Sequence, residues 1–89
     1  KQMRIKKEYI LKEVANQYVV VPTGKETINF NGMLTLNNTA KMLFEALEED
    51  KEIDDLVALL QEHYGIDEQQ ALIDVKDFLT VLESKQMIE

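Results

Sequence analysis

The chain has 89 residues, of which 45% are hydrophobic and 30% charged, a composition that predicts one small globular domain. Its net charge of −7, from 17 acidic and 10 basic side chains, argues against binding to the phosphates of nucleic acids. No apolar run reaches the roughly 18 residues that span a membrane, and no apolar segment follows the basic N-terminus, so we expect neither a membrane partner nor a signal peptide.

Short runs of β-branched and aromatic residues in the first third of the chain predict three strands, at about residues 8–14, 17–22 and 28–36. Asn16 lies between the first two of these strands. Asparagine tolerates the left-handed conformation that a tight turn requires, so we expect the two strands to form a β-hairpin. Pro22 ends the second strand because it cannot donate a hydrogen bond to a neighbouring strand.

The Asn31-Gly32 dipeptide leaves two arrangements open for the third strand. In the first, Ile28–Phe30 pairs back on Met33–Leu36 across this dipeptide, which is a strong hairpin signal. In the second, the dipeptide forms a bulge or bend within one longer strand. The residues alone favour neither arrangement.

From Asn38 onward, apolar residues recur with helical spacing and predict three amphipathic helices, at about residues 38–49, 53–64 and 68–84. Asn37 or Asn38 caps the first helix, and Gly65 suits the left-handed residue that ends the second. Asp67 caps the third, with Gln70 at the spacing of a reciprocal capping box. The predicted core stripes are Ala40, Leu43, Phe44 and Leu47 in the first helix, Ile53, Leu56, Val57, Leu60 and Tyr64 in the second, and Ala71, Val75, Phe78, Leu79 and Leu82 in the third.

Three strands followed by three helices predict an α+β domain of winged-helix type that spans residues 1–89. Each strand buries only one face, so the three-stranded antiparallel sheet needs a second layer to cover its apolar side. The three amphipathic helices supply that layer.

The chain offers few groups for catalysis or metal binding. It has no cysteine, one serine (Ser84) and one histidine (His63), and nothing marks a third residue that would orient them as a catalytic triad. His63 lacks companion metal ligands, and no EF-hand or glycine-rich phosphate loop is present. We therefore expect a non-catalytic protein without a cofactor or metal. The absence of cysteine is consistent with a cytoplasmic protein.

A binding surface is the remaining candidate for function. The edge of a sheet exposes N–H and C=O groups that an extended peptide can pair with by strand addition. In the third strand we place Leu34 and Leu36 on the core side and Met33 and Thr35 on the other. The same edge can also pair with a second copy of the chain, which would make it an oligomerisation domain and a homodimer.

A winged-helix protein that binds nucleic acid is a further alternative, and it requires a basic recognition helix. The third helix has the wrong charge for that role. Its acidic and basic residues are Asp67, Glu68, Asp74, Asp77 and Glu83 against Lys76 and Lys85.

Two segments, Tyr18–Gly24 and Phe30–Thr39, resemble the PqqD family, a group associated with synthesis of the cofactor pyrroloquinoline quinone. The strongest element is Leu36-Asn37-Asn38-Thr39, which enters the first helix and precedes the apolar pair Leu43-Phe44. The family usually has an acidic residue where this chain has Asn38, and often Trp where it has Phe44. The resemblance extends over nearly the whole chain.

The resemblance implies a RiPP recognition element, a non-catalytic chaperone for ribosomally synthesised and modified peptides. Such a domain binds the leader of a precursor peptide as an added strand beside its third strand and against its third helix. It then presents the precursor to a modifying enzyme, often a radical-SAM enzyme.

Carried onto this chain, the resemblance places the peptide-contacting edge at Met33, Leu34, Thr35 and Leu36. The helical wall is one flank of the third helix. Two flanks are open: Asp74, Phe78 and Val81, or Leu72, Lys76 and Leu79. Helical periodicity does not say which of them faces the strand edge.

Overall fold

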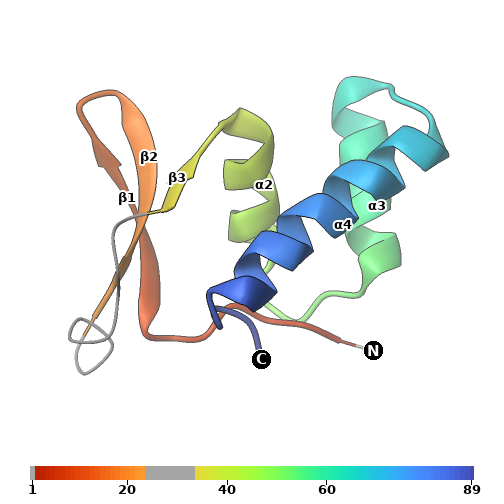
Figure 1. The fold of residues 1–89 in the computed structure, drawn as a ribbon. Helices are drawn as coiled ribbons and strands as arrows, with labels where there is room; N and C mark the ends of the chain where they lie inside the picture. Colours follow the sequence, from red (N-terminus) through yellow and green to blue (C-terminus); the bar gives the residue numbers. More distant parts are fainter. Residues whose placement is uncertain (1, 24–33) are drawn as a thin grey trace.

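The computed structural model describes residues 2–23 and 34–89 and consists of a small sheet packed beside three helices (Figure 1). The elements are, in order, β1 (Tyr9–Val14), β2 (Gln17–Pro22), β3 (Leu34–Leu36), α2 (Asn38–Ala46), α3 (Ile53–Tyr64) and α4 (Glu68–Ser84). This order confirms the predicted α+β class, with three antiparallel strands followed by three helices. The part of the third strand predicted before Leu34, and the two arrangements around Asn31-Gly32, lie outside the described residues.

A two-residue turn joins β1 to β2. Val14 pairs with Gln17, and the residues between them, Ala15 and Asn16, have φ values of 50° and 67°. Positive φ at both central positions is the mark of a type I′ turn, whose twist matches that of the flanking strands. The predicted hairpin and the role of Asn16 in it are confirmed.

The sheet has the order β1-β2-β3 and presents one apolar face to the helices. Alternate side chains on each strand pack on the core: Tyr9 and Leu11 from β1, Tyr18 and Val20 from β2, and Leu34 and Leu36 from β3. Thr35 is exposed and lies on the opposite side of β3. The predicted orientation of Leu34 and Leu36 is therefore confirmed.

Side-chain caps set the starts of α2 and α4. The Asn37 side chain accepts a hydrogen bond from the Ala40 N–H at 2.8 Å, and Asp67 accepts one from the Gln70 N–H at 2.7 Å. The Gln70 amide donates to Asp74 at 2.9 Å. Only the Asp67 half of the predicted capping box is therefore present, because the Gln70 side chain turns along the helix instead of back to the cap.

The helix predicted at 38–49 ends earlier, at Ala46. The Glu48 N–H donates to the Glu45 carbonyl three residues back, so the helix tightens into a turn. The chain then leaves along the N-terminal segment, where Asp50 meets Arg4 at 3.1 Å. Three consecutive acidic residues, 48–50, also oppose the negative end of the helix dipole.

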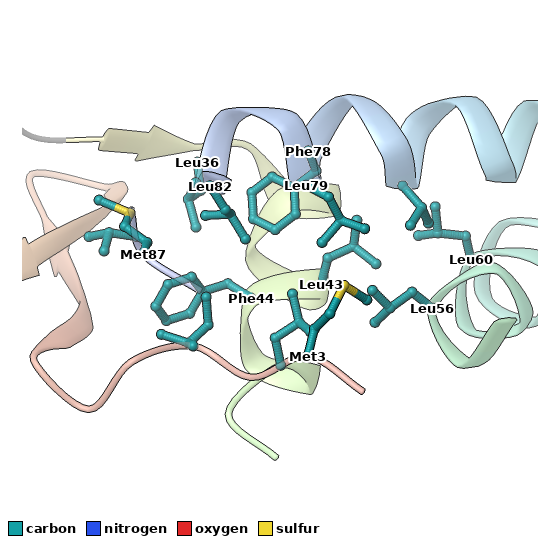
Figure 2. Close-up of a cluster of buried hydrophobic side chains, with 14 of the residues drawn as sticks. Met3, Leu36, Leu43, Phe44, Leu56, Leu60, Phe78, Leu79, Leu82 and Met87 are labelled. Carbon is teal, nitrogen blue, oxygen red and sulfur yellow. The ribbon is translucent and has the colours of Figure 1, made fainter. Parts of the chain in front are cut away.

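The core lies between the sheet and the helices and draws on all of them (Figure 2). Its fully buried large side chains are Val20, Leu43, Phe44, Leu47, Leu56, Leu60, Val75, Leu82 and Met87. Both ends of the chain contribute, since isolated bridges pair Met3 with Lys51 and Ile5 with Ile88. These bridges anchor the N-terminal segment against the C-terminal segment and against the link between α2 and α3.

The predicted core position of Tyr64 is wrong. Its side chain is 43% exposed, and its hydroxyl accepts a hydrogen bond from Thr39 at 3.1 Å. Tyr64 ends α3, and Gly65 follows it with φ of 66°, which confirms Gly65 as the left-handed end of this helix. Among the described residues, no helix is long and apolar enough to cross a membrane.

The burial pattern of α4 gives a stability prediction. Leu82 is fully buried, whereas Ile73 on the same helix is 54% exposed. Leu82→Ala should lower the free energy of unfolding by about 2–5 kcal/mol, because it removes buried contacts and leaves a cavity. Ile73→Ala is the matched control and should change it by less than about 0.5 kcal/mol. Urea unfolding followed by circular dichroism measures both, and equal losses would contradict the described core.

Candidate functional site

β3 lies at an edge of the sheet. Its three residues pair with β2 through Tyr18↔Leu36, Val19↔Thr35 and Val20↔Leu34, and within residues 2–23 and 34–89 no strand pairs with its other side. An edge strand presents unpaired backbone groups to its surroundings. The register of the sheet determines which groups these are.

The hairpin register points the Thr35 backbone outward. In an antiparallel pair, hydrogen-bonded and non-hydrogen-bonded residue pairs alternate. The Thr23 N–H donates to the Glu8 carbonyl at 2.6 Å, so these two residues form a hydrogen-bonded pair. Counting along the ladder in steps of two makes Val14↔Gln17 and Lys12↔Val19 hydrogen-bonded pairs as well. Val19 therefore directs its backbone N–H and C=O to β1.

Tyr18 and Val20 then direct their backbone groups to β3, where they meet Leu36 and Leu34. Thr35, between these two, is the non-hydrogen-bonded partner of Val19. We infer that its N–H and C=O point away from β2, toward the open edge. One donor and one acceptor in the middle of β3 are thereby available to an added strand.

A hollow of about 340 Å³ lies between the start of α2 and the middle of α4. It begins where β3 ends, at Asn37. Its lining residues are Asn37, Thr39, Ala40 and Leu43 from the α2 side, and Asp74, Asp77, Phe78 and Val81 from α4. Figure 2 shows Phe78 pointing from α4 toward the core, into which Leu36 enters from β3 and Leu43 from α2. The hollow therefore has an apolar floor and a polar rim.

The two flanks of α4 face different surroundings. Asp74, Phe78 and Val81 line the hollow beside the β3–α2 junction. Leu79 instead borders a second hollow of about 480 Å³, shared with Met3 and other residues of the chain ends. Of the two predicted flanks, the first therefore shares a hollow with Asn37, the residue that follows β3.

The remaining predicted residues lie apart from the first hollow. Leu72 packs half-buried against the core, and Lys76 is exposed. Met33 lies outside the described residues. Five lining residues were absent from the predicted binding site: Asn37, Thr39, Ala40, Leu43 and Asp77. Helical spacing could have signalled Asp77, which is three residues after Asp74 and four before Val81, but the α2 residues depend on how α2 packs against α4.

The site carries no constellation for catalysis or metal binding. In the described ranges, no group of three or more histidine, cysteine, aspartate or glutamate residues could hold a metal ion. The Ser84 hydroxyl donates to the Val81 carbonyl at 2.7 Å, as serine commonly does at a helix end. The His63 ring contacts the neighbouring Tyr64 ring edge-on at 4.7 Å. What the arrangement can do is bind: it combines a strand edge with an adjacent half-apolar hollow.

Comparisons with known proteins agree with this description. A family model described as coenzyme PQQ synthesis protein D (PqqD) matches residues 17–88. A solved structure of TbiB1 in complex with the TbiA(beta) leader peptide is 20% identical, with a TM-score of 0.77 over 97% of this chain and 94% of that chain. A structure of lasso peptide synthetase B1 complexed with the leader peptide is also 20% identical, with a TM-score of 0.76 over 98% and 96%. A search of curated proteins gives no match.

The inferred backbone orientation makes a prediction for amide hydrogen exchange in the free protein. The amides of Leu34 and Leu36 should be protected, because they donate to β2, whereas the Thr35 amide should exchange rapidly. NMR spectroscopy of the ¹⁵N-labelled protein in D₂O measures the three rates. A Thr35 amide as slow as that of Leu36 would show that the register assigned to this edge is wrong.

Proposed function

The chain belongs to the PqqD family, and from this we propose that it binds the leader of a ribosomally synthesised precursor peptide by strand addition and does not catalyse its modification. The observation that supports this most is the open edge of β3. Its Thr35 lies two residues before Asn37, which lines the same hollow as Phe78 and Val81 of α4. A strand edge gives affinity through main-chain hydrogen bonds, and an adjacent pocket gives selectivity through side chains.

In the proposed complex the leader extends the sheet as a fourth strand, next to β3. Its backbone pairs with the N–H and C=O of Thr35, and it runs along the edge formed by Met33, Leu34, Thr35 and Leu36. Of the two flanks of α4, we assign Asp74, Phe78 and Val81 as the wall, because these residues share the hollow with the start of α2. The second flank, Leu72, Lys76 and Leu79, receives no role in this complex.

Binding of this kind leaves the chemistry to a partner. We propose that the chain presents the bound precursor to a peptide-modifying enzyme, of the radical-SAM class that the family resemblance suggests. Precursor peptides are made on ribosomes, so the proposed place of action is the cytoplasm. The founding product of the family is pyrroloquinoline quinone. The proposed site recognises only the leader, so the precursor peptide and the modifying enzyme determine the product.

A proline substitution at each of the two sheet edges tests the strand-addition proposal. Thr35→Pro removes the outward donor without removing a bond to β2, which is where an edge strand tolerates proline. We expect leader affinity to fall about fivefold, since one net hydrogen bond contributes on the order of 1 kcal/mol and the added strand loses its central one. The ligand is a fluorescently labelled candidate leader, taken from a short precursor-like open reading frame sought near the gene, and its binding is followed by fluorescence anisotropy.

Glu13→Pro is the matched control. Glu13 is exposed on β1, and the same alternation points its amide away from β2 at the opposite edge of the sheet. It should change leader affinity less than twofold, while both variants change the free energy of unfolding by similar amounts. Equal loss of affinity in the two variants would contradict the β3 edge as the site. Loss of self-association in Thr35→Pro, with leader affinity unchanged, would instead point to an oligomerisation domain.

A further inference from the structure

Two carboxylates stand at the rim of the hollow without a cationic partner. Asp74 is half-buried and Asp77 is exposed, and both line the hollow. Within residues 2–23 and 34–89 neither forms an ion pair. Asp74 accepts a hydrogen bond from the neutral Gln70 amide at 2.9 Å, and an ionised carboxylate has capacity for several more. No described basic side chain lines the hollow.

The apolar part of the same wall lies one helical turn away. Phe78 follows Asp74 by four residues, and Val81 follows Asp77 by four, which places each apolar side chain about 6 Å along the helix from its carboxylate. Phe78 is 9% exposed, whereas Val81 is 38% exposed and not covered by the fold. The hollow thus contains an acidic half and an apolar half in fixed order along α4.

An added strand would meet these two halves with alternate side chains. Leu34 and Leu36 face the helices and Thr35 faces away, so the strand residue opposite Thr35 also faces away. The residues on either side of it face the helices. They are about 6.5–7 Å apart in an extended chain, close to the spacing of the two halves of the wall. In Figures 1 and 2 β3 and α4 run in opposite chain directions, and Figure 2 shows Leu36 of β3 next to Leu82 near the C-terminal end of α4.

We propose that the leader segment bound here carries a lysine or arginine two residues from an aliphatic or aromatic side chain, in either order. The cation meets Asp74 and Asp77, and the apolar side chain packs on Phe78 and Val81. This inference depends on the proposed leader binding and adds the chemical class of the ligand to it. Charge complementarity supports it on two scales: the local pair of carboxylates, and the net charge of −7, which attracts a basic segment and repels an acidic one.

Selection from a random peptide library tests the inference and does not require the leader sequence. Random 12-residue peptides displayed on phage are selected on the immobilised full chain and, in parallel, on the double variant Asp74→Asn, Asp77→Asn. The wild-type chain should enrich peptides with a basic and an apolar residue two positions apart. The double variant should keep the apolar preference and lose the basic one.

The outcomes separate this inference from the function on which it rests. If the wild-type chain enriches peptides without a basic preference, or if the preference survives in the double variant, the charge inference is wrong and peptide binding stands. If the selected peptides do not compete for one site, or if they bind the Thr35→Pro variant as tightly as the wild-type chain, the proposed function itself fails. This inference then fails with it.

Affinity measurements on one selected peptide give the magnitude. Replacing its basic residue by glutamine should weaken binding about three- to tenfold to the wild-type chain and less than twofold to the double variant, as expected for a partly desolvated ion pair. Glu83→Gln is the matched control, because Glu83 lies on the same helix but borders the second hollow. This variant should bind the selected peptide with an affinity within twofold of that of the wild-type chain. A Glu83→Gln effect as large as that of the double variant would show a general charge effect instead of a local contact.

Discussion

The register of the sheet, set by the turn at Ala15 and Asn16, is the constraint on which the proposed site depends. Positive φ at both residues makes the turn two residues long and pairs Val14 with Gln17. Because strand side chains alternate with a period of two, a slip by one residue would exchange the buried face of the sheet for the other. Val20 would leave the core, and the side chains of β3, which pairs with β2, would also change faces. The same slip would turn the Thr35 backbone groups toward β2 and direct those of Leu34 and Leu36 to the open edge instead.

The second element of the site is the position of α4 relative to β3, and it follows from core packing. Phe78, Leu79 and Leu82 enter the core from α4, which fixes the rotation of this helix about its axis. With those residues inward, Asp74 and Val81 come to lie on the side of α2. The Asn37 cap starts α2 directly after β3, so the strand edge and the hollow are adjacent in the fold. The proposed binding surface therefore results from the same contacts that stabilise the domain.

Much of this fold could be predicted from the sequence, because its signals are local. Asn37, Gly65 and Asp67 mark helix ends through their own backbone neighbours, and the buried stripe of α4 follows from helical spacing.

Features that depend on distant contacts could not be predicted. The early end of α2 reflects contacts with the N-terminal segment, and the hydrogen bond between the exposed Tyr64 and Thr39 joins residues 25 positions apart. Which flank of α4 shares a hollow with the start of α2 also depends on the packed structure. Leader binding was suggested by family resemblance, since the residues alone indicate only an available edge.

The central claim is that a leader peptide pairs with the open edge of β3 and lies against one flank of α4. An NMR titration of the ¹⁵N-labelled chain with the unlabelled leader tests it most directly. The account predicts that the amide signals of Thr35 and Leu36, and of α4 from Asp74 to Val81, shift together and saturate at one dissociation constant. Intermolecular contacts should connect the leader backbone to Thr35. Shifts confined to the β1 edge around Glu13, or to the second hollow around Leu79, would contradict it.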